Sequence, residues 1–206
     1  MEKTSLDFLL ELLSTPSPSG AEYRLQRVWL DYVKKFAKVT TDHSGNAIGI
    51  LNPDAQFKVL LAGHSDEIGM MVNRIDDKGF VYFSQSGGIN PLLLPGLKVE
   101  ILGYKGKTIN GVVGFNRKSD GDAPPKTKCS DFFIDCGFSS GEELKKHIRV
   151  GDYILYRSDP EILNGDRVVC KGLDNKTGAF IVAEILKKLS KRKLKVAVYA
   201  VSTTGE

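Results

Sequence analysis

One short stretch limits what this chain can fold into more than any other. Residues 58–62 form a nearly continuous apolar run, and His64, Asp66 and Glu67 follow directly after a glycine. A run of this kind, bounded by polar residues, is typical of a strand buried on both faces of a sheet. We therefore expect a central strand that delivers polar side chains at its carboxyl end.

The spacing of these polar residues suggests a metal site. Alternation along an extended chain places His64 and Asp66 on one side and Glu67 on the other. A histidine that ligates a metal commonly has its second ring nitrogen held by a carboxylate, and Asp66 is placed to do this. A buried histidine satisfied by a carboxylate, without a metal, is nevertheless the commoner outcome for His-x-Asp alone. The spacing by itself leaves both interpretations open.

Size and charge indicate an ordinary globular protein. The 206 residues allow one large domain or two small ones, and the hydrophobic fraction of 41% and charged fraction of 26% are typical of such chains. The net charge of +4 is spread along the sequence. The densest basic run, residues 187–193, contains no aromatic residue, so we expect a solvated helix end and no nucleic-acid partner.

The cysteines and the hydropathy indicate the compartment. Cys129, Cys136 and Cys170 are odd in number and show no C-x-x-C spacing, which favours a reducing environment. The charged N-terminus does not resemble a signal peptide, and no apolar segment approaches the ~20 residues of a membrane span. We expect a cytoplasmic protein without a membrane partner.

The two ends of the chain predict one α/β layer, a mixed sheet flanked by helices. Thr4 or Ser5 is a plausible N-cap for the first helix, and Ser19-x-x-Glu22 has the form of a capping box for the second. The expected elements are helices over residues 6–13, 25–36 and 179–189, and strands over residues 39–42, 47–51, 58–62 and 195–201.

The middle of the chain has a different sequence pattern from its two ends. Short apolar pieces alternate with glycine-containing turns, which is typical of a small barrel or sandwich. We expect residues 70–159 to form an inserted all-β barrel domain, and residues 1–69 and 160–206 to form the discontinuous α/β domain. A polar loop is expected over residues 116–128 and a short helix over 141–147. The expected strands cover residues 72–75, 80–83, 98–102, 111–115, 132–136 and 153–156.

Four chemically active side chains fall at element ends of the α/β layer. His64 and Asp66 follow a strand, Asp174 precedes a helix, and Glu206 follows the last strand. Ligands of open α/β sheets gather at the carboxyl ends of the strands. Their convergence there would favour a metal site over a buried, satisfied histidine.

Seven motifs, in order, resemble those of the M42 family of metallo-aminopeptidases, relatives of the glutamyl and tetrahedral aminopeptidases. The resemblance covers nearly the whole chain. The motifs are Ala62-Gly63-His64-Ser65-Asp66-Glu67-Ile68-Gly69, Gly87-Gly88-Ile89, Leu94-Pro95-Gly96, Ile134-Asp135-Cys136-Gly137, Val150-Gly151-Asp152, Leu173-Asp174-Asn175-Lys176-Thr177-Gly178 and Thr204-Gly205-Glu206.

This resemblance implies a zinc-peptidase-like fold and a cytoplasmic exopeptidase that acts on peptides with two divalent metal ions, zinc or cobalt. It implies that His64 ligates one metal, that Asp174 bridges both, and that Asp66 supports the histidine. Glu206 would be the general base, and the peptide bond after Asp174 would be cis. The barrel insert would form homodimers, and the dimers would build a hollow dodecamer.

The sequence departs from the family pattern in one major respect. The family continues beyond the position of Glu206 with a lobe that supplies a second glutamate, another acid and a late histidine, and this sequence lacks them. His64 and Asp174 alone are fewer ligands than zinc normally takes. We therefore expect the chain to be a truncated piece of a longer enzyme. Asn175 and Lys176 also stand where the family usually has Asp and Arg.

Two alternatives to a complete aminopeptidase follow. The chain could act only as an assembly or binding module, in which Tyr82, Phe83 and Leu92-Leu93-Leu94 form either a subunit interface or barrel core. A glycoside hydrolase is the poorest alternative, because it needs two carboxylates that face one sugar. Asp66 and Glu67 are expected to point to opposite sides.

Overall fold

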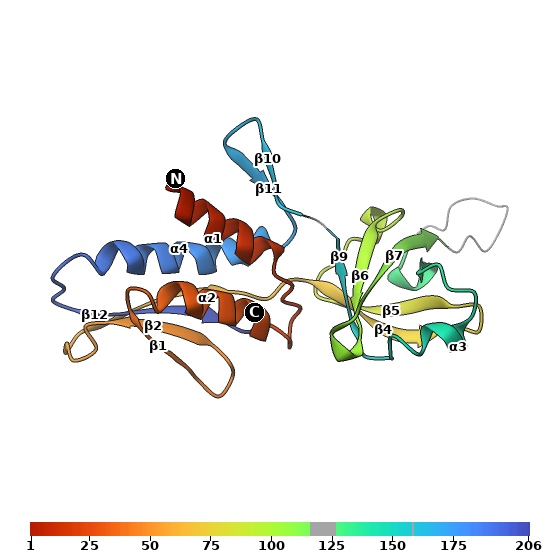
Figure 1. Cartoon of the computed structure of the whole chain (residues 1–206), viewed down its shortest axis with the longest axis horizontal. Helices are drawn as coiled ribbons and strands as arrows, with labels where there is room; N and C mark the ends of the chain where they lie inside the picture. Colours follow the sequence, from red (N-terminus) through yellow and green to blue (C-terminus); the bar gives the residue numbers. More distant parts are fainter. Residues whose placement is uncertain (116–126, 158) are drawn as a thin grey trace. The chain divides into compact units, whose positions relative to one another are not determined.

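The chain folds into two compact units, one made of Met1–Glu67 with Ser158–Glu206 and the other of Ile68–Arg157. The computed structural model describes residues 1–115, 127–157 and 159–206 (Figure 1). The first unit is α/β and the second is a closed β-barrel, so the predicted fold class is confirmed. Most of the predicted loop over residues 116–128 lies outside the described residues.

The α/β unit contains a four-stranded mixed sheet in the order β1-β2-β12-β3. Strand β12 runs parallel to β3 and antiparallel to β2. A separate hairpin, β10 with β11, precedes the last helix. The elements are α1 (Lys3–Ser14), α2 (Tyr23–Val33), β1 (Lys38–Thr41), β2 (Ala47–Leu51), β3 (Lys58–His64), β10 (Glu161–Leu163), β11 (Arg167–Val169), α4 (Leu173–Leu189) and β12 (Ala197–Thr203).

The core of this unit lies between the helices and one face of the sheet. Leu25, Trp29 and Val33 of α2 are spaced four residues apart, which places them on one side of the helix. They pack in one cluster with Leu186 of α4 and with small residues of β2 and β12 such as Ala200. Small side chains on the sheet let the two helices approach it closely. Figure 1 shows α2 and α4 lying along the sheet.

The prediction that residues 58–62 form a central strand buried on both faces is wrong. Strand β3 lies at the edge of the sheet and pairs only with β12 among the described strands. Its side chains alternate, so that Leu61 packs toward the core while Leu60 on the opposite face is 66% exposed. The apolar composition of the run therefore does not reflect its burial in this structure.

Both predicted helix caps are also wrong, because the candidate side chains have tertiary partners. Helix α1 begins after Glu2, and the Ser5 hydroxyl donates to Glu184 Oε2 at 2.7 Å. Helix α2 begins after Glu22 without a side-chain cap, and the Ser19 hydroxyl donates to Asp66 Oδ2. The hydroxyls of Ser5 and Ser19 thus form hydrogen bonds to residues distant in the sequence and do not cap the helices.

The second unit is a six-stranded barrel in the order β4-β5-β8-β7-β6-β9. Its interior is one apolar cluster that includes Phe83 and Leu94, whereas Leu92 and Leu93 are 72% and 68% exposed. Phe83 and Leu94 are therefore barrel core. The elements are β4 (Gly69–Ile75), β5 (Phe80–Ser86), η1 (Pro91–Leu93), β6 (Lys98–Leu102), η2 (Tyr104–Gly106), β7 (Thr108–Phe115), η3 (Cys129–Asp131), β8 (Phe132–Asp135), α3 (Gly141–Leu144) and β9 (Tyr153–Tyr156).

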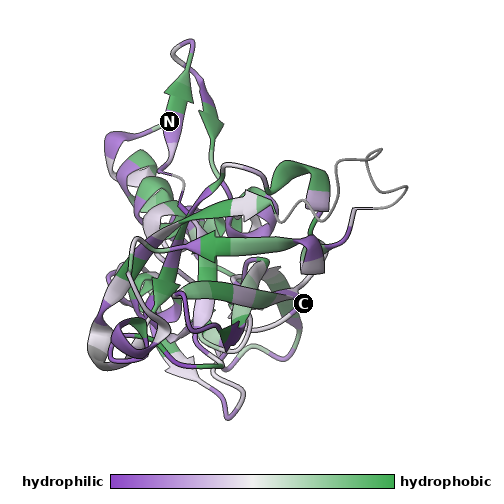
Figure 2. Cartoon of the chain, turned by 90° about the vertical axis from the view of Figure 1, so that its right-hand side faces the viewer, coloured by the Kyte–Doolittle hydropathy of each residue, from purple (hydrophilic) through white to green (hydrophobic). Residues whose placement is uncertain are grey.

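The β10–β11 hairpin was not predicted. Its strands have three residues each, too short for a clear alternation pattern. Ile162 and Leu163 are about half exposed, and Figure 2 shows apolar colouring along the hairpin. Separately, the described helices include none long and apolar enough to cross a bilayer.

The buried face of α4 gives a direct test of this core. Replacement of Leu186 by alanine removes a fully buried side chain and is expected to lower the free energy of unfolding by about 2–5 kcal/mol. Ile181→Ala on the same helix is the matched control, because Ile181 is 52% exposed and its loss should cost less than about 1 kcal/mol. Urea unfolding followed by circular dichroism measures both, and equal losses would contradict the assigned core face.

Candidate metal centre

His64 is the last residue of β3, and its ring orientation is fixed by Asp66. The imidazole Nδ1 lies 3.0 Å from Asp66 Oδ1, as the alternation along the strand predicts. The other oxygen of this carboxylate accepts a hydrogen bond from the Ser19 hydroxyl at 2.5 Å. Asp66 is only 6% exposed. Because an ionised carboxylate only accepts hydrogen bonds, this contact favours a proton on Nδ1, and in the neutral ring Nε2 then has the lone pair.

Asp174 stands opposite that lone pair. Its Oδ1 lies 3.4 Å from His64 Nε2, and its side chain is 92% exposed. Asp174 and Asn175 interrupt the helical backbone at the beginning of α4, and the peptide bond between them is cis, as the family resemblance implies. The Asn175 side chain accepts a hydrogen bond from the Gly178 N–H at 2.9 Å, which anchors the first regular turn.

Gly63 allows β3 and α4 to approach closely enough for this arrangement. A Cβ on Gly63 would lie 2.4 Å from the carbonyl carbon of Gly178, a distance that no side chain permits. The strand residue before His64 therefore touches the helix backbone four residues after Asp174. Only a residue without a side chain at position 63 places the imidazole and the carboxylate within reach of each other.

The geometry of His64 and Asp174 fits a shared divalent cation. Zinc binds imidazole nitrogen at about 2.0–2.1 Å and carboxylate oxygen at about 2.0–2.2 Å, so two tetrahedral ligands lie about 3.4 Å apart. The observed separation of Nε2 and Oδ1 has this value. The donor types and the orienting carboxylate also suit zinc or cobalt.

The donor set is incomplete. No group of three or more His, Cys, Asp or Glu side chains that could hold a metal occurs within residues 1–115, 127–157 and 159–206. Glu206 is exposed, and it forms no hydrogen bond or ion pair with the described residues. The structure therefore brings His64, Asp66 and Asp174 together and does not join Glu206 to them.

Glu67 belongs to a second, buried cluster beside this site. Its carboxylate lies 3.0 Å from Lys176 Nζ and 2.8 Å from Lys171 Nζ, and it is 2% exposed. Burial raises the pKa of the Glu67 carboxyl, but the two lysine charges outweigh this and hold the pKa below its usual range. Neither lysine could be predicted as a partner of Glu67, since nothing in local spacing links residues more than 100 positions apart.

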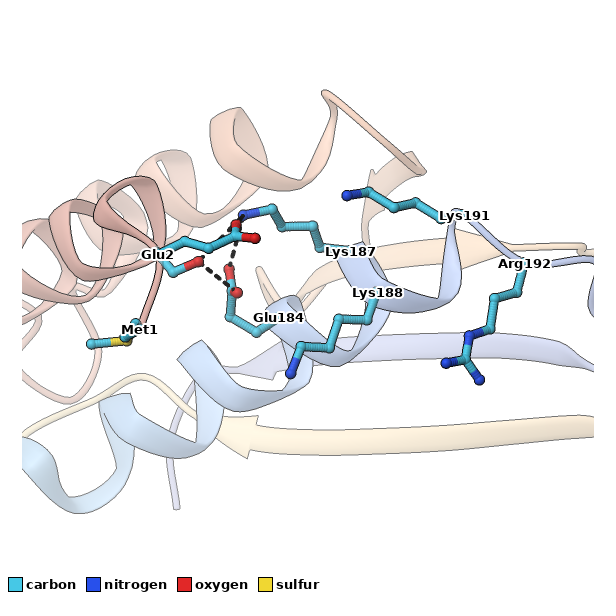
Figure 3. Close-up of a pocket in the computed structure, with 8 residues that line it drawn as sticks. Met1, Glu2, Glu184, Lys187, Lys188, Lys191 and Arg192 are labelled. Carbon is cyan, nitrogen blue, oxygen red and sulfur yellow. Dashed lines mark hydrogen bonds and ion pairs between the residues drawn. The ribbon is translucent and has the colours of Figure 1, made fainter.

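A pocket of about 530 Å³ lies elsewhere in the same unit, between the start of α1 and the end of α4 (Figure 3). Glu184 there binds Ser5 and Tyr32, and Lys187 contacts Glu184 and Glu2. Lys188, Lys191 and Arg192 complete the charged lining. None of the predicted site residues lines this pocket, so it is separate from the candidate metal centre.

The profile of the M42 glutamyl aminopeptidase family matches residues 45–206. A putative aminopeptidase of Acetivibrio thermocellus is 32% identical over 207 residues, which cover 100% of this chain and 59% of the relative.

Solved structures give the same result. The TET aminopeptidase of a marine-sediment Thaumarchaeota archaeon has a TM-score of 0.91 and 27% identity, with 99% of this chain and 60% of that chain covered. The TET1 peptidase of Pyrococcus horikoshii has a TM-score of 0.85 and 29% identity, with 97% and 61% covered. The chain thus spans about three-fifths of the length of these relatives. With its ordered motifs, its barrel-bearing fold and this family match, the chain belongs to the M42 glutamyl aminopeptidase family.

Proposed function

We propose that this chain carries part of the metal site of an aminopeptidase that removes N-terminal residues from peptides. The observation that carries the proposal is the separation of 3.4 Å between His64 Nε2 and Asp174 Oδ1, which suits two ligands of one ion. The relatives described as aminopeptidases support the reaction class.

The residues of this chain have distinct roles in the proposal. Zinc or cobalt, when bound, supplies Lewis-acid chemistry for hydrolysis of the peptide bond. His64 offers Nε2, and Asp66 keeps the ring in the tautomer that leaves Nε2 free. Asp174 is exposed and has two carboxylate oxygens, so it suits a bridging position between two ions. Glu206 is assigned the transfer of a proton from the attacking water to the leaving amine.

A complete site needs donors beyond these residues. Zinc in catalytic sites normally has three protein ligands, and the described chain gathers two. The relatives extend beyond the part of their sequence that this chain matches. We propose that the remaining metal ligands come from a further lobe of this kind. The activity of the 206-residue chain alone is therefore expected to be low.

Self-association is part of the proposal. The Pyrococcus horikoshii TET1 peptidase is described as assembling into a tetrahedron or a large octahedral shell. We propose that the barrel unit forms homodimers and that dimers assemble into a dodecamer. The exposed Leu92 and Leu93 of η1 support a contact surface there. A cytoplasmic location is consistent with Cys129 and Cys136 as reduced thiols.

The structure offers no support for a glycoside hydrolase. Asp66 is engaged by His64 and Ser19, and Glu67 is buried against Lys171 and Lys176. Neither carboxyl group is free to face a sugar across the ~5 to 10 Å that the reaction requires. An assembly-only role predicts an intact barrel without metal binding at His64, and the following measurements distinguish it.

Replacement of His64 by alanine is expected to abolish cobalt binding at this site, because half of the described donor set is lost. Isothermal titration of the apo-protein with Co²⁺ measures the affinity. His43→Ala is the matched control, since His43 is exposed in a turn and should leave binding unchanged. Equal affinities for the wild type and His64→Ala would contradict the metal site. Aminoacyl-nitroanilide hydrolysis that survives in metal-loaded His64→Ala would contradict the mechanism.

Asp66→Asn tests the orienting role of the carboxylate. The amide no longer enforces the Nδ1 proton, so cobalt affinity should fall about 10- to 100-fold while the fold is retained. Asp54→Asn, an exposed aspartate in a turn, should leave the affinity unchanged. The same titration measures both variants, and an unaltered affinity in Asp66→Asn would remove Asp66 from the site.

A further inference from the structure

Lys176 is a charged side chain with no solvent exposure, two residues after Asp174. Its Nζ donates to Glu67 Oε1 at 3.0 Å and to the Thr15 carbonyl oxygen at 2.9 Å. The side chains of Lys176 and Glu67 are 0% and 2% exposed. A buried ion pair of this kind is weak evidence for stability, because well-packed apolar residues often replace such pairs without loss. Its position suggests a different role.

Glu67 lies close to His64 in the sequence, as Lys176 lies close to Asp174. It lies three residues after His64 and one after Asp66. Its backbone N–H donates to the Ser17 carbonyl at 2.9 Å, and its Oε1 accepts from the Ser17 N–H at 3.0 Å. These two hydrogen bonds tie the segment that follows His64 to Ser17, and the same carboxylate reaches Lys176 of α4.

The start of α4 is fixed to the same carboxylate. Lys171 Nζ lies 2.8 Å from Glu67 Oε2, so the two lysines occupy different oxygens. Gly172 lies between them with φ +67°, and a Cβ there would lie 3.1 Å from Glu67 Oε2 and 3.2 Å from Lys176 Cε. The backbone therefore turns tightly around the ion pair before it reaches Asp174.

We propose that the buried Lys176–Glu67 pair is a positioning device that holds Asp174 opposite His64 at the distance one cation requires. Lys176 and Glu67 touch no reacting atom and act only through the two donors. The inference rests on the proposed metal site. It assigns to Lys176 a role in metal affinity that is separate from any role in stability.

Three variants of the pair separate these roles. Lys176→Met leaves Glu67 with one cation and should weaken Co²⁺ binding about 10- to 100-fold in protein that circular dichroism shows to be folded. Lys176→Arg keeps the charge and should stay within about fivefold of the wild type. Glu67→Gln with Lys176→Met removes both charges of the fully buried pair and leaves only Lys171, whose side chain is 16% exposed, so it should recover stability without recovering affinity.

Lys187→Met is the matched control. Lys187 is also a largely covered lysine of α4, with its side chain 21% exposed and contacts to Glu2, Ser5 and Tyr32. It lies about three turns beyond Lys176, so its loss should alter stability and leave Co²⁺ affinity unchanged. The proposal is overturned if Lys176→Met binds as the wild type does, or if Lys187→Met or Lys176→Arg loses as much affinity as Lys176→Met.

A metal-free measurement keeps this inference separate from the proposed function. If wild-type Co²⁺ binding does not depend on His64, the proposed metal site fails, and a crystal structure of apo Lys176→Met or of the double variant then decides the positioning role. A separation of His64 Nε2 and Asp174 Oδ1 above about 5 Å, beyond the reach of one shared ion, supports it. A separation that remains at the wild-type value overturns it.

Discussion

The close approach of β3 to the beginning of α4 is the constraint on which the candidate site depends. The lack of a side chain at Gly63 permits contact with the backbone of Gly178, and this contact brings together His64 and Asp174, which lie 110 residues apart in the sequence. Parallel pairing of β3 with β12 then places the ends of both strands at one edge of the sheet. His64 reaches Asp174 because of this local geometry.

Charge distribution around the contact is divided between two clusters. On one side, Asp66 orients His64, and the side chain of Asp174 is exposed to solvent. On the other side, Glu67 faces inward and neutralises buried lysine charge. Alternation at the end of one strand thus directs two consecutive carboxylates to different partners, Asp66 to His64 and Glu67 to the buried lysines.

Much of the fold could be predicted from periodicity, since helix stripes such as Leu25, Trp29 and Val33 and the short strands of the barrel follow simple patterns. The burial of β3 could not, because an apolar run does not show how many faces are covered. The N-caps failed because Ser5 and Ser19 bind distant carboxylates. The His64–Asp66 contact was predictable from spacing, and Asp174 was indicated by its place before a helix and by the family resemblance. The lysine partners of Glu67 required the structure.

The exposed edge of β3 has a consequence for the behaviour of the chain in solution. Peptide N–H and C=O groups along its free side have no partner strand among the described elements, and Leu60 presents an uncovered apolar side chain beside them. Such an edge is a template onto which another extended segment can add by main-chain hydrogen bonding. Concentrated preparations of this chain are therefore expected to be prone to aggregation by strand pairing. The positive charge of Lys58, at the start of the strand, opposes this pairing by repulsion between chains.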